Sequence, residues 1–190
     1  LTTTSTERMV FMVYILLADG FEEIEALCPL DLLRRAGVDA KTVSVTEKRV
    51  VTGSHGIPVT ADLTAENSLS DIEMLVLPGG MPGTTNLDKS QFCDGLLRAA
   101  AKNGAYIAAI CAAPMVLGRR GLLNGKEAVC FPGFEHELAG AHLSERRVVT
   151  DGKIITGVGM GAALEFGLAL VEVFCGKETA DKLGGSVLAK

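Results

Sequence analysis

The 190-residue sequence is poor in aromatic residues, with no tryptophan, two tyrosines and seven phenylalanines. It also lacks a long lysine- and arginine-rich stretch, and its formal net charge of −5 comes from interspersed acids and bases. Proteins that bind nucleic acid use basic surfaces, often with aromatic side chains on which bases stack. The composition therefore argues against a nucleic-acid partner.

No run of about 18 apolar residues is present, so we expect no membrane-spanning segment and no membrane partner. The first residues also lack the basic and then apolar layout of a secretory signal. We interpret residues 1–11 as a disordered leader. The length of residues 12–190 suits a single domain.

Paired cysteine motifs are absent too. The five cysteines are Cys28, Cys93, Cys111, Cys130 and Cys175. Their number is odd, no two form a C-x-x-C motif, and no secretory signal precedes them, so we expect free thiols in a reducing cytoplasm. The three histidines, His55, His136 and His142, show no metal-ligand spacing, and we expect no metal site.

What the sequence does contain is an alternation of short apolar runs with amphipathic segments. Strands are predicted at 13–18, 40–45, 74–77, 105–110 and 127–130, and a hairpin around Asp151-Gly152. Helices are predicted at 22–36, 87–102, 112–120, 162–174 and 177–190. This order is typical of an α/β fold with a mainly parallel sheet and helices on both faces. Sites in such folds form at the carboxyl ends of strands, where residues 19–25, 78–83 and 111–114 meet the rule.

Cys111 follows the apolar run AYIAAI and precedes a predicted helix. A residue at such a sharp strand-to-helix turn is held in a strained conformation with its side chain exposed above the sheet. Free N–H groups of the following helix would favour the thiolate, so we expect a lowered thiol pKa. The alternative is an inert buried cysteine at a strand end.

Glu25 lies in the acidic start of the first predicted helix, beside Glu22 and Glu23. We expect two of these acids to face solvent or cap the helix, and one to point at the strand ends. A buried carboxyl there would have a raised pKa and could donate a hydrogen bond to sulfur. The alternative is an acid-rich helix start with no further role.

Other candidates carry weaker signals. Gly79 and Gly80 follow a buried strand and can offer backbone N–H groups to an oxyanion, although the same glycines suit a simple turn. The GVGMG segment at 157–161 lacks the spacing of a dinucleotide-binding loop, and no cofactor is expected. His136 is the best histidine candidate for an accessory base, against the alternative of a surface-loop histidine.

Four ordered segments, LLADGFEEIEALCPLDLLRRAG, LVLPGGMPG, AAICAAP and ALEFGLALVE, resemble the ThiJ/PfpI superfamily, in its Parkinsonism-associated deglycase-like branch. The resemblance implies a flavodoxin-like three-layer fold, a homodimer and no cofactor. It also implies a reactive Cys111, a protonated Glu25 hydrogen-bonded to the thiol, and amide donors at Gly79 or Gly80 and at Ala112.

Two positions depart from the pattern of the family. Phe131 stands where many members have a histidine, which disfavours cysteine-peptidase chemistry. Val158 stands where members usually have an arginine, so no role of that arginine is transferred.

These residues suggest a cofactor-independent, cysteine-dependent protein that acts on small reactive aldehydes or glycated substrates, as glyoxalases and deglycases do. A redox-sensing stress-response protein, whose Cys111 is oxidised to sulfinic acid with little turnover, is the alternative. A chaperone-like interaction module is the third hypothesis.

Overall fold

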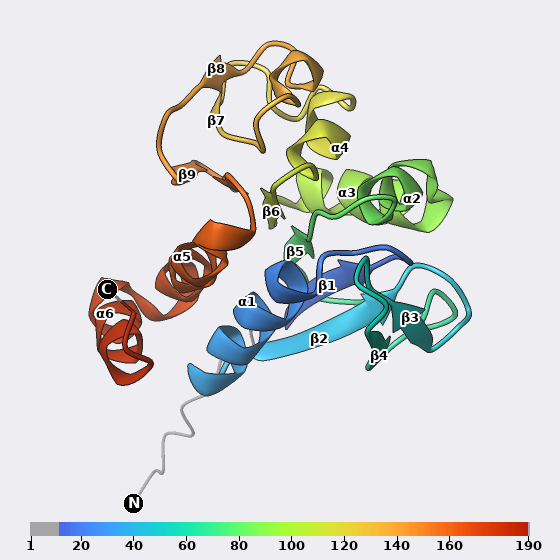
Figure 1. Cartoon of the computed structure of the whole chain (residues 1–190), viewed down its shortest axis with the longest axis horizontal. Coiled ribbons are helices and arrows are strands. Elements are labelled where there is room, and N and C mark those ends of the chain that lie inside the picture. Colours follow the sequence, from blue (N-terminus) through green and yellow to red (C-terminus); the bar gives the residue numbers. More distant parts are fainter. Residues whose placement is uncertain (1–11, 190) are drawn as a thin grey trace, which may run out of the picture.

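The computed structural model describes residues 12–189, so the leader predicted at residues 1–11 lies outside the described residues. A six-stranded sheet forms the centre (Figure 1). Its strands, in their order across the sheet, are β2 (Asp39–Ser44), β1 (Met12–Leu17), β5 (Ile72–Leu77), β6 (Tyr106–Ile110), β10 (Ile154–Gly157) and β9 (Val148–Asp151). All neighbours pair in parallel except β10 and β9. The predicted α/β fold with a mainly parallel sheet is confirmed.

Helices cover both faces of this sheet (Figure 1). One face carries α1 (Glu23–Arg35) and α5 (Ala163–Cys175), with α6 (Lys177–Ser186) packed against α5. The other face carries α2 (Gly83–Lys89), α3 (Gln91–Asn103) and α4 (Pro114–Gly118). The result is a three-layer arrangement with one hydrophobic core on each side of the sheet.

Strand β1 shows why its sequence is apolar throughout. Val13, Ile15 and Leu17 face the core under α1 and α5, whereas Tyr14 and Leu16 face the opposite core. Successive side chains of a strand point to opposite faces, so a strand covered on both sides needs apolar residues at every position.

Two small sheets lie outside the central one. The hairpin of β3 (Val50–Thr52) and β4 (Pro58–Thr60) is antiparallel, and β7 (Glu127–Ala128) pairs in parallel with β8 (His142–Leu143). Two short 3₁₀ helices, η1 (Glu135–Glu137) and η2 (Met160–Ala162), complete the described elements.

The helix predicted at 87–102 is wrong in its extent. The structure has two helices here, because Ser90 adopts an extended conformation between α2 and α3. The Ser90 hydroxyl accepts a hydrogen bond from the backbone N–H of Cys93 at 3.2 Å, which is an N-cap of α3. The hairpin predicted around Asp151-Gly152 is confirmed by the antiparallel pairing of β9 and β10. Strand β8 was not predicted, since both its residues are exposed.

Strand β1 marks the point where the order of the sheet reverses, with β2 on one side and β5 on the other. Ligands of open parallel sheets bind in the crevice beyond the carboxyl ends of the strands at such a point. The loops that follow β1, β5 and β6 meet there. Within the described range, no helix is both long and apolar enough to cross a membrane.

Candidate active site

Cys111 follows the last residue of β6 and has a left-handed backbone, with φ of 65°. Its N–H donates to the carbonyl of Gly157 at 2.9 Å, and its own carbonyl accepts from the N–H of Phe131 at 2.8 Å. A residue other than glycine in this region costs of order 1–3 kcal/mol and persists only where the surroundings hold it. The predicted strained turn is therefore present, and it leaves the Cys111 side chain half-buried.

Glu25 has no exposed surface, although it lies in the first turn of α1. The Glu22 carboxylate accepts a hydrogen bond from the N–H of Glu25 at 2.8 Å and so caps the helix. Gly79 then joins both acids: its N–H donates to Oε2 of Glu25 at 2.8 Å, and its carbonyl accepts from the N–H of Glu22 at 2.9 Å. These bonds fix the buried carboxyl at the carboxyl end of β5.

Gly79 is the point at which Glu25 and Cys111 meet. A Cβ atom built on Gly79 would lie 2.6 Å from Oε2 of Glu25 and 2.7 Å from Cβ of Cys111. The amide N–H groups predicted as donors in this region face different groups. Gly79 donates to Glu25, whereas the N–H groups of Gly80 and Ala112 face the sulfur of Cys111 and lower its pKa. The structure thus brings together all five of the residues predicted here: Cys111, Glu25, Gly79, Gly80 and Ala112.

Burial raises the pKa of Glu25 to about 7, and the negative charge of Glu22 adds to this effect. The thiol of Cys111 and the N–H of Gly79 oppose it. Within the described residues, Oε1 of Glu25 has no hydrogen-bond partner of ordinary geometry. The raised pKa predicted for a buried carboxyl at this place is consistent with the structure, and it makes Glu25 a proton donor and acceptor near neutral pH.

The expected lowering of the thiol pKa is wrong for the isolated chain. Burial, followed by the charge of Glu25, raises the pKa of Cys111 to about 12, against the N–H groups of Ala112 and Gly80. The helix that was expected to start at once begins only at Pro114 and is five residues long, so its dipole is weak at the sulfur. Because two adjacent negative charges repel, an ionised Glu25 makes the Cys111 thiol harder to ionise.

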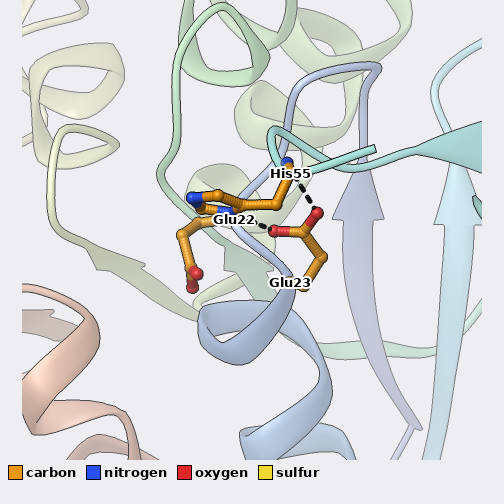
Figure 2. Close-up of side chains that lie close together, drawn as sticks. All are labelled: Glu22, Glu23 and His55. Atoms are coloured by element: carbon orange, nitrogen blue, oxygen red, sulfur yellow. Dashed lines mark hydrogen bonds and ion pairs between the residues drawn. The ribbon is translucent and has the colours of Figure 1, made fainter. Parts of the chain in front are cut away.

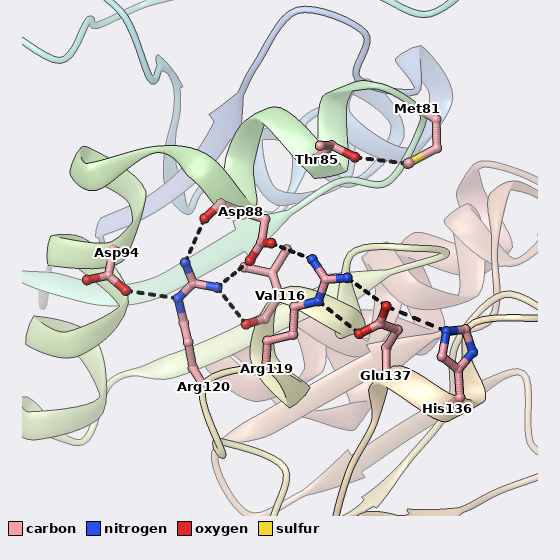
Figure 3. A network of polar contacts seen from close by, with 9 residues as sticks. All are labelled: Met81, Thr85, Asp88, Asp94, Val116, Arg119, Arg120, His136 and Glu137. Atoms are coloured by element: carbon pink, nitrogen blue, oxygen red, sulfur yellow. Dashed lines mark hydrogen bonds and ion pairs between the residues drawn. The ribbon is translucent and has the colours of Figure 1, made fainter.

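His136 does not join this group. It lies in η1 with an exposed ring whose Nε2 is 3.5 Å from the Glu137 carboxylate, and Glu137 is bound in turn by Arg119 (Figure 3). No contact in the described part of the chain links His136 to Cys111 or Glu25. The structure therefore does not bring the candidate accessory base to Cys111, and the exposed ring of His136 lies beside Glu137, as the surface-loop alternative expects.

Phe131 contacts the site through its backbone. Its N–H supports the Cys111 carbonyl, and its half-exposed ring lies near Gly159, where an added Cβ would meet it at 3.1 Å. Phe131 thus presents an apolar ring and no proton-transfer group at the position where the family pattern led us to expect a histidine. Val158 likewise offers a backbone bond, from its N–H to the carbonyl of Arg147 at 2.9 Å.

Glu23 and His55 are the residues that sequence reasoning missed. Glu23 was expected to face solvent or cap the helix, yet it is only 5% exposed. Its carboxylate accepts from the backbone N–H of His55 and interacts with Nδ1 of the ring, both at 2.8 Å (Figure 2). Burial would raise the pKa of Glu23, but its bonds with His55 outweigh burial and lower it to about 2. No local pattern predicts this contact, because 32 residues separate the two side chains.

Metal-ligand atoms of Glu22, Glu23 and His55 lie within 4.8 Å of one another, the one such group in the described part of the chain. However, both oxygens of Glu23 are engaged by His55, and an oxygen of Glu22 caps α1. A metal ion would have to displace these bonds, so we assign none here.

The remaining cysteines lie in apolar surroundings. Cys93 and Cys130 are buried, and burial raises the pKa of the former to about 12 and of the latter to about 11. Cys28 and Cys175 are half-buried, and burial raises the pKa of both thiols. The pKa does not distinguish Cys111 from these thiols; the strained turn, the two facing N–H groups and the buried carboxyl do.

Comparison with known proteins agrees with this geometry. The model of the DJ-1/PfpI family matches residues 12–173. The chain is 39% identical to protein DJ-1 homolog B of Arabidopsis thaliana over 99% of its own length, but it spans only 43% of that relative. It is 34% identical to protein dj-1beta of Drosophila melanogaster, covering 92% of this chain and 95% of the relative. A deglycase of Pyrococcus abyssi is 32% identical, over 76% of this chain and 87% of the relative.

Two solved structures show the same fold. A cysteine-to-alanine mutant of a DJ-1 superfamily protein from Salmonella typhimurium has a TM-score of 0.91 at 33% identity, covering 95% of this chain and all of the other. Oxidised DJ-1 of Toxoplasma gondii has a TM-score of 0.88 at 38% identity, covering 94% and 98% of the two chains. This chain belongs to the DJ-1/PfpI family, in the branch of the DJ-1 and Parkinson disease protein 7 homologues.

Proposed function

We propose that this protein is a cofactor-independent enzyme that acts on reactive carbonyl compounds, as a glyoxalase or a deglycase does. The observation that carries the proposal is the meeting of the Cys111 thiol with a fully buried carboxyl whose pKa is raised to about 7. The deglycase of Pyrococcus abyssi, similar over 76% of the chain, supports the substrate class.

The first step joins the sulfur to the substrate. Ionised Glu25 takes the proton of the Cys111 thiol while the sulfur attacks the aldehyde carbon of a 2-oxoaldehyde. The carbonyl π bond breaks, and Glu25 passes the thiol proton on to the carbonyl oxygen, which gives a hemithioacetal and an ionised Glu25. This route needs no thiolate in the resting enzyme, and the N–H groups of Gly80 and Ala112 are placed to stabilise negative charge near the sulfur.

The second step moves hydrogen between two carbons. Ionised Glu25 removes the proton from the hemithioacetal carbon to give an enediolate and delivers it to the neighbouring carbon, while the hydroxyl proton of the first carbon passes to the oxygen of the second. One carbon is oxidised to a thioester and the next is reduced from a ketone to an alcohol, so no external electron acceptor is needed. A carboxyl whose pKa lies near the working pH suits both halves of this transfer.

Hydrolysis completes the cycle. Water adds to the thioester, the carbon–sulfur bond breaks, and the products are a 2-hydroxy acid and the free thiol of Cys111. An early glycation adduct enters the same cycle when sulfur displaces the amine from its hemiaminal carbon. The amine then leaves with one proton.

Turnover of methylglyoxal to lactate tests the proposal. The wild-type protein is expected to form lactate, and Cys111→Ala is expected to lower the rate by at least about 10³-fold, since it removes the nucleophile. Cys93→Ala is the matched control, because Cys93 is a buried thiol in α3 that plays no part in the scheme. Equal rates for the wild type and Cys111→Ala would refute the proposal.

Oxidation at Cys111 is the second candidate function. Two backbone N–H groups face its sulfur, as a sulfinate would require, and oxidised DJ-1 of Toxoplasma gondii is a similar structure. Peptide mass spectrometry after mild peroxide treatment should find sulfinic acid at Cys111 before any other cysteine. Oxidation of all five cysteines to the same extent would exclude this role.

The oligomeric state is also a proposal. We propose a homodimer, consistent with the exposed Ile24 side chain on α1, which is 48% exposed in the single chain. Sedimentation of the purified protein tests this directly.

A further inference from the structure

The tip of the β3–β4 hairpin is fastened to the first turn of α1. The backbone N–H of Ser54 donates to the carbonyl of Phe21 at 2.8 Å, and His55 holds the Glu23 carboxylate through both its backbone and its ring. Gly53 lies directly against that carboxylate, since an added Cβ would sit 2.2 Å from its Oε1. Glu23 is therefore enclosed by the hairpin, whereas the side chain of His55 is 70% exposed.

The same turn of α1 carries the bonds that position Glu25. Glu22 caps the N–H of Glu25, and Gly79 bonds the backbone of Glu22 and the carboxyl of Glu25. Figure 2 shows the ring of His55 lying beside Glu22 and Glu23. Two acids thus lie at the start of this helix: Glu23 pairs directly with His55, and the charge of Glu22 also acts on the imidazole.

We propose that His55 is a positioning residue for the active site: through Glu23 and Glu22 it fixes the first turn of α1 and balances the charge beside Glu25, so that the reactivity of Cys111 depends on the protonation of His55. Any effect of His55 on turnover rests on the proposed function. Its effect on the reactivity of the Cys111 thiol does not depend on that function.

The direction follows from the charges. The hydrogen bond and the charge of Glu23 raise the pKa of His55, and Glu22 adds to this. The groups that face its ring are Glu22 and Glu23 from α1 and the Ser54 hydroxyl, 3.2 Å from Nδ1, on its own loop. When the pH rises past the pKa of His55, its positive charge is lost, and the negative charge of Glu22 acts on Glu25 without that compensation. Ionisation of Glu25 and then of Cys111 becomes harder.

The test is the rate of alkylation of Cys111 by iodoacetamide as a function of pH, read by peptide mass spectrometry. His55→Ala is expected to slow alkylation about three-fold near neutral pH, the size of an exposed charge effect, and to move the profile to higher pH. His55→Arg keeps the charge and should restore the neutral rate. His55→Gln keeps a hydrogen-bond donor without charge and should behave like His55→Ala.

His136→Ala is the matched control, an exposed histidine paired with an acid away from Cys111, and its profile should follow the wild type. A His55→Ala profile that superimposes on the wild type, with or without a lower melting temperature, would overturn the proposal and leave His55 a structural role only. Failure of methylglyoxal turnover in the wild type would refute the proposed function but leave the alkylation profiles readable, so the two failures are distinguishable.

Discussion

The carboxyl of Glu25 and the side chain of Cys111 converge on the backbone of Gly79, from the start of α1 and the end of β6. Only a residue without a Cβ atom fits between them, because such an atom would lie under 3 Å from each side chain. The absence of a side chain at residue 79 is thus a condition for the contact on which the proposed chemistry depends.

Gly79→Ala should therefore abolish the contact. The added methyl group would displace the carboxyl or the thiol, and we expect loss of methylglyoxal turnover and a changed rate of Cys111 alkylation. Gly95→Ala is the control: it lies in α3 with nothing within 4 Å of an added Cβ, and alanine should stabilise that helix by about 0.5–1 kcal/mol. Unchanged turnover and alkylation in Gly79→Ala would contradict this account of the site.

Burial of Glu25 predicts a loss of stability as the pH rises. Its pKa is about 7 in the folded protein and close to 4.5 in the unfolded chain, so in this window the folded state holds the proton that the unfolded state has released. The contribution is full below about pH 4.5 and is lost as the pH passes about 7, an upper limit of about 3 kcal/mol.

Urea unfolding of the wild type and of Glu25→Gln, at a series of pH values, measures this contribution of Glu25 to the free energy of unfolding. The difference in unfolding free energy between the two proteins should move in favour of Glu25→Gln as the pH rises through this range. A difference that stays constant with pH would mean that folding does not raise the pKa of Glu25.

The backbone conformation of Cys111 predicts that, at this position, a glycine variant is more stable than an alanine variant, the reverse of the usual order. At a φ of 65°, glycine is unstrained and alanine is not, so Cys111→Gly should be about 1 kcal/mol more stable than Cys111→Ala. At neighbouring Ala113, with φ of −63°, the ordinary order holds, and Ala113→Gly should destabilise the protein. Thermal unfolding of these variants gives the answer; a Cys111→Gly protein less stable than Cys111→Ala would argue against strain at the turn.

The ion pairs around Asp88 should contribute to stability rather than to turnover. Its carboxylate binds Arg119 at 2.6 Å and Arg120 at 2.7 Å, and only 16% of its side chain is exposed (Figure 3). Asp88→Ala leaves Arg120 half-buried without this partner, and we expect a loss of about 1–3 kcal/mol. Methylglyoxal turnover below the melting temperature should stay at the wild-type rate, and a large loss of turnover would link this network to the site.

Much of the fold was predictable because local sequence and tertiary environment agree. Strand β1 is apolar at every position as a doubly covered strand requires, and Asp151-Gly152 supplies the turn of the β9–β10 hairpin. The turn at Cys111 was predictable for the same reason, as a strand followed at once by small residues. The break at Ser90 was missed, since apolar periodicity continues through a cap that one hydroxyl creates.

The electrostatics of the site could not be predicted from local sequence. Glu23 is buried because the fold brings the hairpin at residues 53–55 to the start of α1, far from Glu23 in the sequence. The thiol pKa depends on the balance between burial and two amide N–H groups, one of which belongs to a different loop. The surroundings of the candidate His136 likewise depend on a contact between separate segments, because its neighbour Glu137 is bound by Arg119, 18 residues away.

The central claim is that Glu25 transfers the protons in carbonyl chemistry at Cys111. The most direct measurement is the initial rate at which Glu25→Gln converts methylglyoxal into lactate, with circular dichroism and Cys111 alkylation as checks that the site is folded. Glutamine retains the shape but cannot accept or donate the proton, so the rate should fall at least about 10²-fold. A folded Glu25→Gln protein that forms lactate at the wild-type rate would contradict the account.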